Sequence, residues 1–81
     1  TPLHLACQKN NENIVKYLVE QPSANVNTQN KNGNTALHLA CQNKNENIVK
    51  CLIEKGANVN TQNKDENTPL HLACQKIMKT L

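Results

Sequence analysis

The chain has 81 residues, a formal net charge of +3 at pH 7 and Tyr17 as its one Phe, Tyr or Trp, so it forms at most one small domain with a core of Leu, Ile, Val, Ala and Cys. Its nine basic residues are all Lys and lie scattered, whereas nucleic-acid recognition usually depends on clustered charge, Arg side chains and stacking aromatics, so we expect no nucleic-acid partner. No apolar run approaches the roughly 18 residues of a membrane-spanning helix, so we expect no membrane insertion.

One stretch of sequence occurs three times. Residues 1–8 and residues 68–75 both read TPLHLACQ, and residues 35–42 differ from them only in Ala36. The copies begin 34 and then 33 residues apart, and self-similarity at such a period indicates a stacked repeat array. With one inserted residue allowed near Pro22, residues 1–34 match residues 35–67 at 24 of 33 positions. We therefore expect repeats at 1–34 and 35–67, and an incomplete third repeat at 68–81.

Each copy of this stretch predicts a short helix. A threonine precedes the apolar residues, where its hydroxyl oxygen can accept from an unpaired backbone N–H as an N-cap: Thr1, Thr35 and Thr68. Pro2 and Pro69 then occupy the first helical turn, where the missing donor costs nothing. The i, i+3, i+4 spacing of a helix face is filled by Leu3, Ala6 and Cys7, widened by Leu5. We expect the first of these helices to end near residue 8 or 9.

A second helix follows each copy after a turn. Asn10 and Asn11 break the first helix, because asparagine tolerates the left-handed conformation and also caps helices. The apolar positions of the next segment again have helical spacing and are Ile14, Val15, Leu18 and Val19. Gly56 fits the left-handed residue that follows a helix in the second repeat, and Pro22 ends the corresponding helix in the first.

The remaining segments, residues 25–34 and 58–67, are polar apart from Val26 and Val59. A turn at Gly33, which can take positive φ, predicts an extended finger or hairpin. Asn and Gln are so frequent that a disordered, prion-like tract is an alternative. Their recurrence at matching positions between apolar helical segments favours a folded array.

Three segments together resemble the ankyrin repeat: TPLHLA, then ENIVKYLVE or ENIVKCLIE, then KGANVN at 55–60. The resemblance implies an all-α, ankyrin-type helix-turn-helix solenoid with short β-hairpin or finger loops. It also implies a non-enzymatic module that binds another protein with its finger tips and the exposed side of its first helices. By motif position the partner-binding residues are Gln8, Lys9, Lys31, Asn32, Asn34, Gln42, Asn43, Lys64, Asp65, Asn67, Gln75 and Lys76. Taken singly, each is more often an ordinary solvated residue.

The resemblance also implies a structural role for the Thr and His of each motif. The family's histidine bonds to the Thr of its own motif and to neighbouring backbone, which assigns these pairs: Thr1 with His4, Thr35 with His38, Thr68 with His71. Each His precedes a Cys by three residues, so a zinc site is the alternative. Equivalent helices lie about 8–10 Å apart, too far for shared zinc ligands or for disulfides. We therefore expect no metal and no cofactor, and free, mostly buried thiols, as in a reducing, intracellular and probably cytoplasmic setting.

The chain departs from the family at two kinds of turn. Family repeats place Gly between the helices, where this chain has Asn10, Lys44 and Ile77, and at the finger tip, where it has Gly33 but then Glu66. These residues are expected at positive φ. Ile77 suits a turn poorly, so the last helix is expected to continue to about Thr80.

Other functions have less support. With Ser23 as the one serine, no serine–histidine arrangement or Gly-rich phosphate loop is present, so we expect no enzyme. The near-identity of the two repeats supports an alternative reading as a structural spacer or adaptor segment of a larger polypeptide, with the activity in flanking domains. Because the array is incomplete, self-association is a further possibility.

Overall fold

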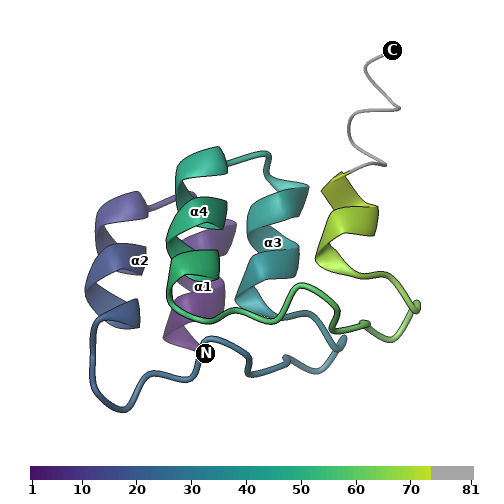
Figure 1. Cartoon of the computed structure of the whole chain (residues 1–81), viewed down its shortest axis with the longest axis horizontal. Helices are drawn as coiled ribbons and strands as arrows, with labels where there is room; N and C mark the ends of the chain where they lie inside the picture. Colours follow the sequence, from purple (N-terminus) through teal and green to yellow (C-terminus); the bar gives the residue numbers. More distant parts are fainter. Residues whose placement is uncertain (74–81) are drawn as a thin grey trace.

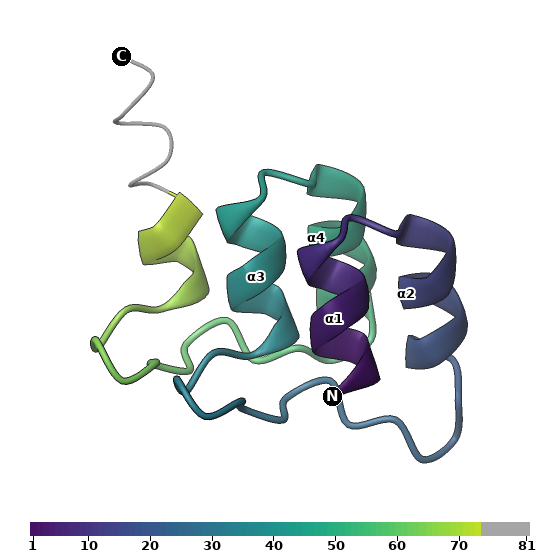
Figure 2. The same ribbon diagram turned by 180° about the vertical axis from the view of Figure 1, so that it is seen from behind.

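The computed structural model describes residues 1–73, and this part of the chain is helical without β-strands. Its complete helices are α1 (Pro2–Gln8), α2 (Glu12–Val19), α3 (Ala36–Gln42) and α4 (Glu46–Glu54), and residues 69–73 are helical as well. Figures 1 and 2 show α1, α3 and residues 69–73 in one row, α2 and α4 in a second row, and the long loops at one edge. The predicted all-α helix-turn-helix solenoid is confirmed.

Local side chains start every helix where the sequence predicts it. The Thr1 and Thr35 hydroxyl oxygens accept from the backbone N–H of the histidine three residues on. Asn11 and Asn45 cap the second helices by accepting from the N–H of Ile14 and Ile48. Helices of seven to nine residues are too short to persist alone in water, so these caps depend on packing between helices.

The predicted left-handed residues are confirmed where the structure describes them. Asn10 and Lys44 have φ of 58° and 59° in the turns between helices, and Glu66 has φ of 65° at the second finger tip. Gly33 and Gly56 also have positive φ, 79° and 91°. Lys44 and Glu66 thus hold a conformation that L-residues other than Asn and Gly rarely adopt.

Replacing Lys44 by Gly should therefore stabilise the chain. The left-handed strain is of order 1 kcal/mol, and relieving it should raise the thermal midpoint by roughly 4–8 °C in a domain of this size. Asn10→Gly is the matched control at the equivalent turn, and it should gain less, because asparagine tolerates this conformation. Melting curves from far-UV circular dichroism measure both. An unchanged or lower midpoint for Lys44→Gly would contradict the strain argument.

The core lies between the two rows of helices. α1 packs on α2 and α3, and α4 packs on α2 and α3, so one apolar cluster connects both repeats. Leu37, Ile48 and Leu52 are its largest aliphatic members, each no more than 1% exposed. The expectation that Leu5 widens the buried stripe of α1 is wrong, since this side chain is 53% exposed. Its repeat-equivalent Leu39 is 7% exposed, because α1 packs against α3 and no described helix takes that place beside α1.

The fingers are held by amide side chains rather than by strands. Asn27 Nδ2 donates to the Gly56 carbonyl at 3.2 Å, and Asn27 Oδ1 accepts from the Asn58 N–H at 2.7 Å. Gln29 Nε2 donates to the Gln62 carbonyl at 3.1 Å. The abundant Asn and Gln residues thus join the first finger to the second, which satisfies backbone groups that a strand pairing would otherwise satisfy.

The cysteines Cys7, Cys41 and Cys51 are free thiols. Cys7 is fully buried, and this burial, with a smaller contribution from the nearby Cys51, raises its pKa to about 12. Cys41 and Cys51 are half-buried, and burial raises the pKa of each. These thiols behave as small apolar side chains of the array.

Two further observations complete the fold. Among the helices of residues 1–73, none combines the length and the apolar character that crossing a membrane requires. The expected continuation of the last helix to about Thr80, and with it the expected behaviour of Ile77, lies outside the described residues.

Candidate functional site

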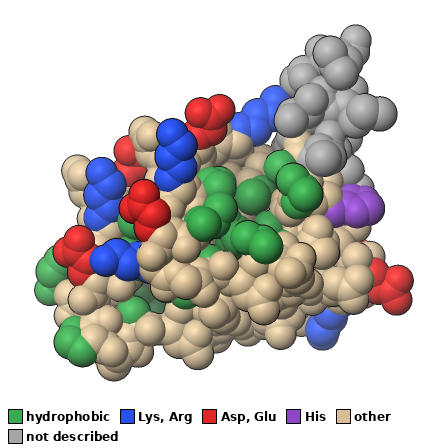
Figure 3. All heavy atoms as spheres, in the orientation of Figure 1, with side chains coloured by type: hydrophobic (Ala, Val, Ile, Leu, Met, Phe, Trp, Pro, Cys, Tyr) green, Lys and Arg blue, Asp and Glu red, His purple; other side chains and the backbone are tan. Residues whose placement is uncertain are grey.

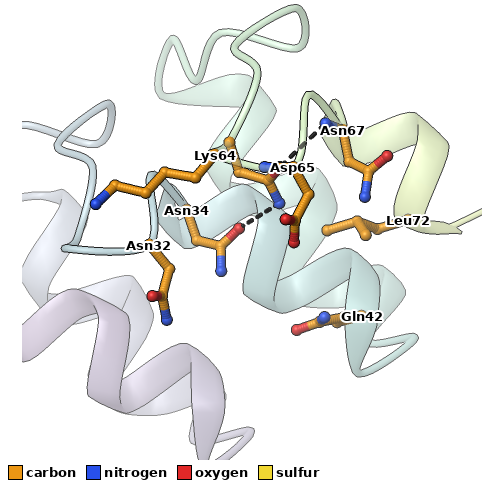
Figure 4. A pocket seen from close by; sticks show the side chains of 8 residues that line it. Asn32, Asn34, Gln42, Lys64, Asp65, Asn67 and Leu72 are labelled. Atoms are coloured by element: carbon orange, nitrogen blue, oxygen red, sulfur yellow. Dashed lines mark hydrogen bonds between the residues drawn. The ribbon is translucent and has the colours of Figure 1, made fainter.

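The candidate site is a hollow of about 470 Å³ between the two fingers, α3 and the helical residues 69–73. Figure 4 shows its side chains converging from these elements. Its lining consists of Asn32, Asn34, Gln42, Asn63, Lys64, Asp65, Asn67 and Leu72. We call this surface the finger hollow. It brings together six of the twelve residues that the sequence nominates for partner binding.

Asn63 organises the wall of the finger hollow. Its side-chain Oδ1 accepts from the backbone N–H of Asp65 at 2.9 Å and of Asn67 at 3.0 Å, which fixes the turn of the second finger. Its Nδ2 donates to Asn34 Oδ1 at 2.9 Å, so the same side chain ties this finger to the first (Figure 4). The sequence reasoning missed Asn63. Its equivalent Asn30 makes the same turn in the first finger, and that recurrence was the available signal.

Buried histidines anchor the base of each finger. His38 Nε2 lies 2.9 Å from the carbonyl oxygen of Asn67, and His4 Nε2 lies 2.8 Å from that of Asn34. A carbonyl can only accept, so each Nε2 carries a proton and donates. His38 Nδ1 is then the acceptor for the backbone N–H of Thr35 at 3.0 Å. The neutral ring therefore connects a helix start to the finger of its own repeat.

The third Thr–His pair is arranged differently in one respect. Thr68 Oγ1 accepts from the backbone N–H of His71 at 3.2 Å, as at the start of an N-capped helix. The His71 side chain is exposed, whereas His38 is fully buried.

The finger hollow presents polar groups that are free to bind. Within residues 1–73, no hydrogen bond engages the side chains of Gln42, Lys64, Asp65 or Asn67. Lys64 supplies a cation, Asp65 an anion, and the amides both donate and accept. Leu72, 6% exposed, adds an apolar patch that the sequence reasoning did not assign to the site.

The other nominated residues lie elsewhere. Gln8, Lys9 and Lys31 are exposed but do not line the finger hollow. The Asn43 amide donates to the carbonyls of Cys7 and Gln8, both at 3.1 Å, and so connects α3 to the end of α1. Gln75 and Lys76 lie outside the described residues. Within residues 1–73, no three His, Cys, Asp or Glu side chains lie together as a metal site would require.

Comparison with known families connects this geometry to a known architecture. A family model described as ankyrin repeats, three copies, matches residues 3–81. A comparison with curated proteins finds no match for the chain.

Proposed function

Because the chain belongs to the ankyrin repeat family, we propose that it is a non-enzymatic module that binds a partner protein in its finger hollow. The supporting observation is the convergence of unengaged polar side chains from both fingers and α3 on one concave surface. Family repeats are in general protein-interaction modules, and this hollow is the described surface that combines concavity, charge and free hydrogen-bonding groups.

The chemistry of the finger hollow suits an extended peptide segment. Amide side chains such as Gln42 and Asn67 match the alternating N–H and C=O groups of a peptide backbone. Lys64 and Asp65 lie next to each other and offer one charge of each sign, so the site favours a polar segment over a strongly acidic or basic one. The fingers are already fixed by Asn63 and His38, so binding would cost little ordering entropy.

The test removes the free side chains without touching those that hold the fold. The triple variant Gln42→Ala, Lys64→Ala, Asp65→Ala should lose capture of a partner identified by pull-down from the native cell, with affinity lower by at least about tenfold. The matched control changes the same residue types on and beside α2: Lys16→Ala, Glu20→Ala and Gln21→Ala. This control should bind as the parent chain does. Titration by calorimetry gives both affinities.

Two outcomes would contradict the proposal. Equal loss in both variants would show that the finger hollow holds no special place. A chain that captures nothing, presented within its full-length protein, would favour the spacer reading.

A further inference from the structure

A second concave surface lies on the other side of residues 69–73, away from the fingers. It is a groove of about 380 Å³ with an apolar floor of Cys41, Val49 and Ala73 and a charged rim of Lys44, Glu46 and Lys50. Figure 3 shows hydrophobic side chains gathered on this face, between α4 and the last described helix. We call this surface the helix socket. Ile53 and Leu70, 48% and 68% exposed, are further apolar side chains of α4 and of helical residues 69–73.

The first repeat shows what fills such a surface. Cys7, Val15 and Ala40 are the repeat-equivalents of the socket floor, and all three are fully buried at 0% exposure. Val19, the equivalent of Ile53, is 7% exposed, and Leu37, the equivalent of Leu70, is 1% exposed. The apolar cluster that buries them includes Ile48 and Leu52, which lie four residues apart on one face of α4. The socket is therefore shaped for a helix with aliphatic residues at this spacing.

The rim adds a polar preference. Glu46 is the equivalent of Glu12, whose carboxylate accepts from Asn47 Nδ2 of α4 at 3.4 and 3.5 Å. A helix lying in the socket as α4 lies on α2 would bring an Asn in its first turn to Glu46. The two rim lysines, Lys44 and Lys50, complement acidic side chains on the same helix. The α4 sequence itself, NENIVKCLIEK with its N-cap, has all of these features.

The occupant need not carry a finger, because Glu66 opposes one. A Cβ on Gly33 would lie 2.8 Å from the Lys64 nitrogen of the next finger, closer than real Cβ atoms come to backbone. Glu66 is the equivalent of Gly33 and has a Cβ at similar φ. A third finger stacked as the second stacks on the first would meet that Cβ. A lone helix avoids this clash.

We propose that the helix socket binds an amphipathic α-helix of a partner protein, with Ile and Leu four residues apart, a preceding Asn and acidic flanks. The helix would run parallel to α4, as α4 runs along α2. The socket surface continues the established interface between the two repeats, which is the physical reason that it accepts a further helix. This site is separate from the finger hollow, so the two proposals stand or fall independently.

The test uses a fluorescein-labelled peptide that copies residues 45–55, with Cys51→Ala to prevent disulfide exchange. Anisotropy should show saturable binding to the whole chain. Ile53→Glu and Leu70→Glu should each weaken it by at least about tenfold, since a carboxylate would be forced against an apolar helix face. Leu5→Glu is the matched control, an exposed leucine at the other end of the array, and it should leave binding unchanged. Because all three side chains are about half exposed or more, the variants should melt as the parent chain does.

A second peptide separates helix recognition from non-specific adhesion. The version with Ile48→Gln and Leu52→Gln should not bind, and equal binding by both peptides would overturn the proposal. Absence of saturable binding, or equal affinity for the Leu70→Glu and Leu5→Glu variants, would overturn it as well. Analytical ultracentrifugation addresses a second copy of the chain as occupant. Dimers that Leu70→Glu abolishes and excess peptide leaves intact would assign the socket to self-association instead.

Discussion

Replacing His38 by Ala should lower the free energy of unfolding by roughly 3–5 kcal/mol, a large share of the stability of so small a domain. The side chain is fully buried, so the variant leaves a cavity in the core. It also leaves the Thr35 N–H and the Asn67 carbonyl oxygen without their partner. The finger base should loosen along with the start of α3, so the finger hollow should lose its shape.

His71→Ala is the matched control for this prediction. The same tripeptide Leu-His-Leu surrounds both histidines, but His71 is exposed, and its described hydrogen bond uses its backbone N–H, which the substitution keeps. We expect a change within about 0.5 kcal/mol. Urea unfolding followed by far-UV circular dichroism measures both variants. Equal losses for the two histidines would show that the link from His38 to the finger is not what stabilises the array.

These paired residues also show what could be predicted from the sequence. Helix starts were predictable because Thr and Asn caps act within three residues, and the left-handed turns were predictable because steric strain belongs to a single residue. Burial was less so. Leu5 and Leu39 have the same residues on either side, yet one is exposed and the other buried, because burial depends on which helix packs on the outside.

The candidate site was predictable to a similar extent. Stacking places equivalent residues of successive repeats in rows, so motif position alone nominated Lys64, Asp65 and Gln42. It also nominated Asn43, whose amide turns out to bridge α3 and α1. A side-chain amide suits a partner and a neighbouring carbonyl equally well, so the choice depends on three-dimensional distance. Asn63 and Leu72 were missed for the same reason.

Gly33→Ala should destabilise the chain by roughly 2–4 kcal/mol, the second large effect expected of a single methyl group or ring. Two causes add. Gly33 has φ of 79°, a conformation that alanine adopts only with strain. The added Cβ would lie 2.8 Å from the Lys64 nitrogen and 3.1 Å from the carbonyl carbon of Asn63, so the second finger must move. That movement would weaken the Lys64 N–H bond to the Asn32 carbonyl, now 3.0 Å long.

Gly56→Ala separates the two causes. Gly56 has φ of 91°, but no atom lies within 4 Å of the position that its Cβ would take, so this variant has the strain without the clash. It should lose about 1 kcal/mol, and the excess loss in Gly33→Ala then measures the contact between fingers. Glu66→Gly should change stability in the other direction, because it relieves strain at φ of 65°. Equal destabilisation by Gly33→Ala and Gly56→Ala in urea titrations would mean that the fingers do not touch at Gly33. The finger hollow, whose wall includes Asn63 and Lys64, would then lack the rigid frame on which the proposed binding depends.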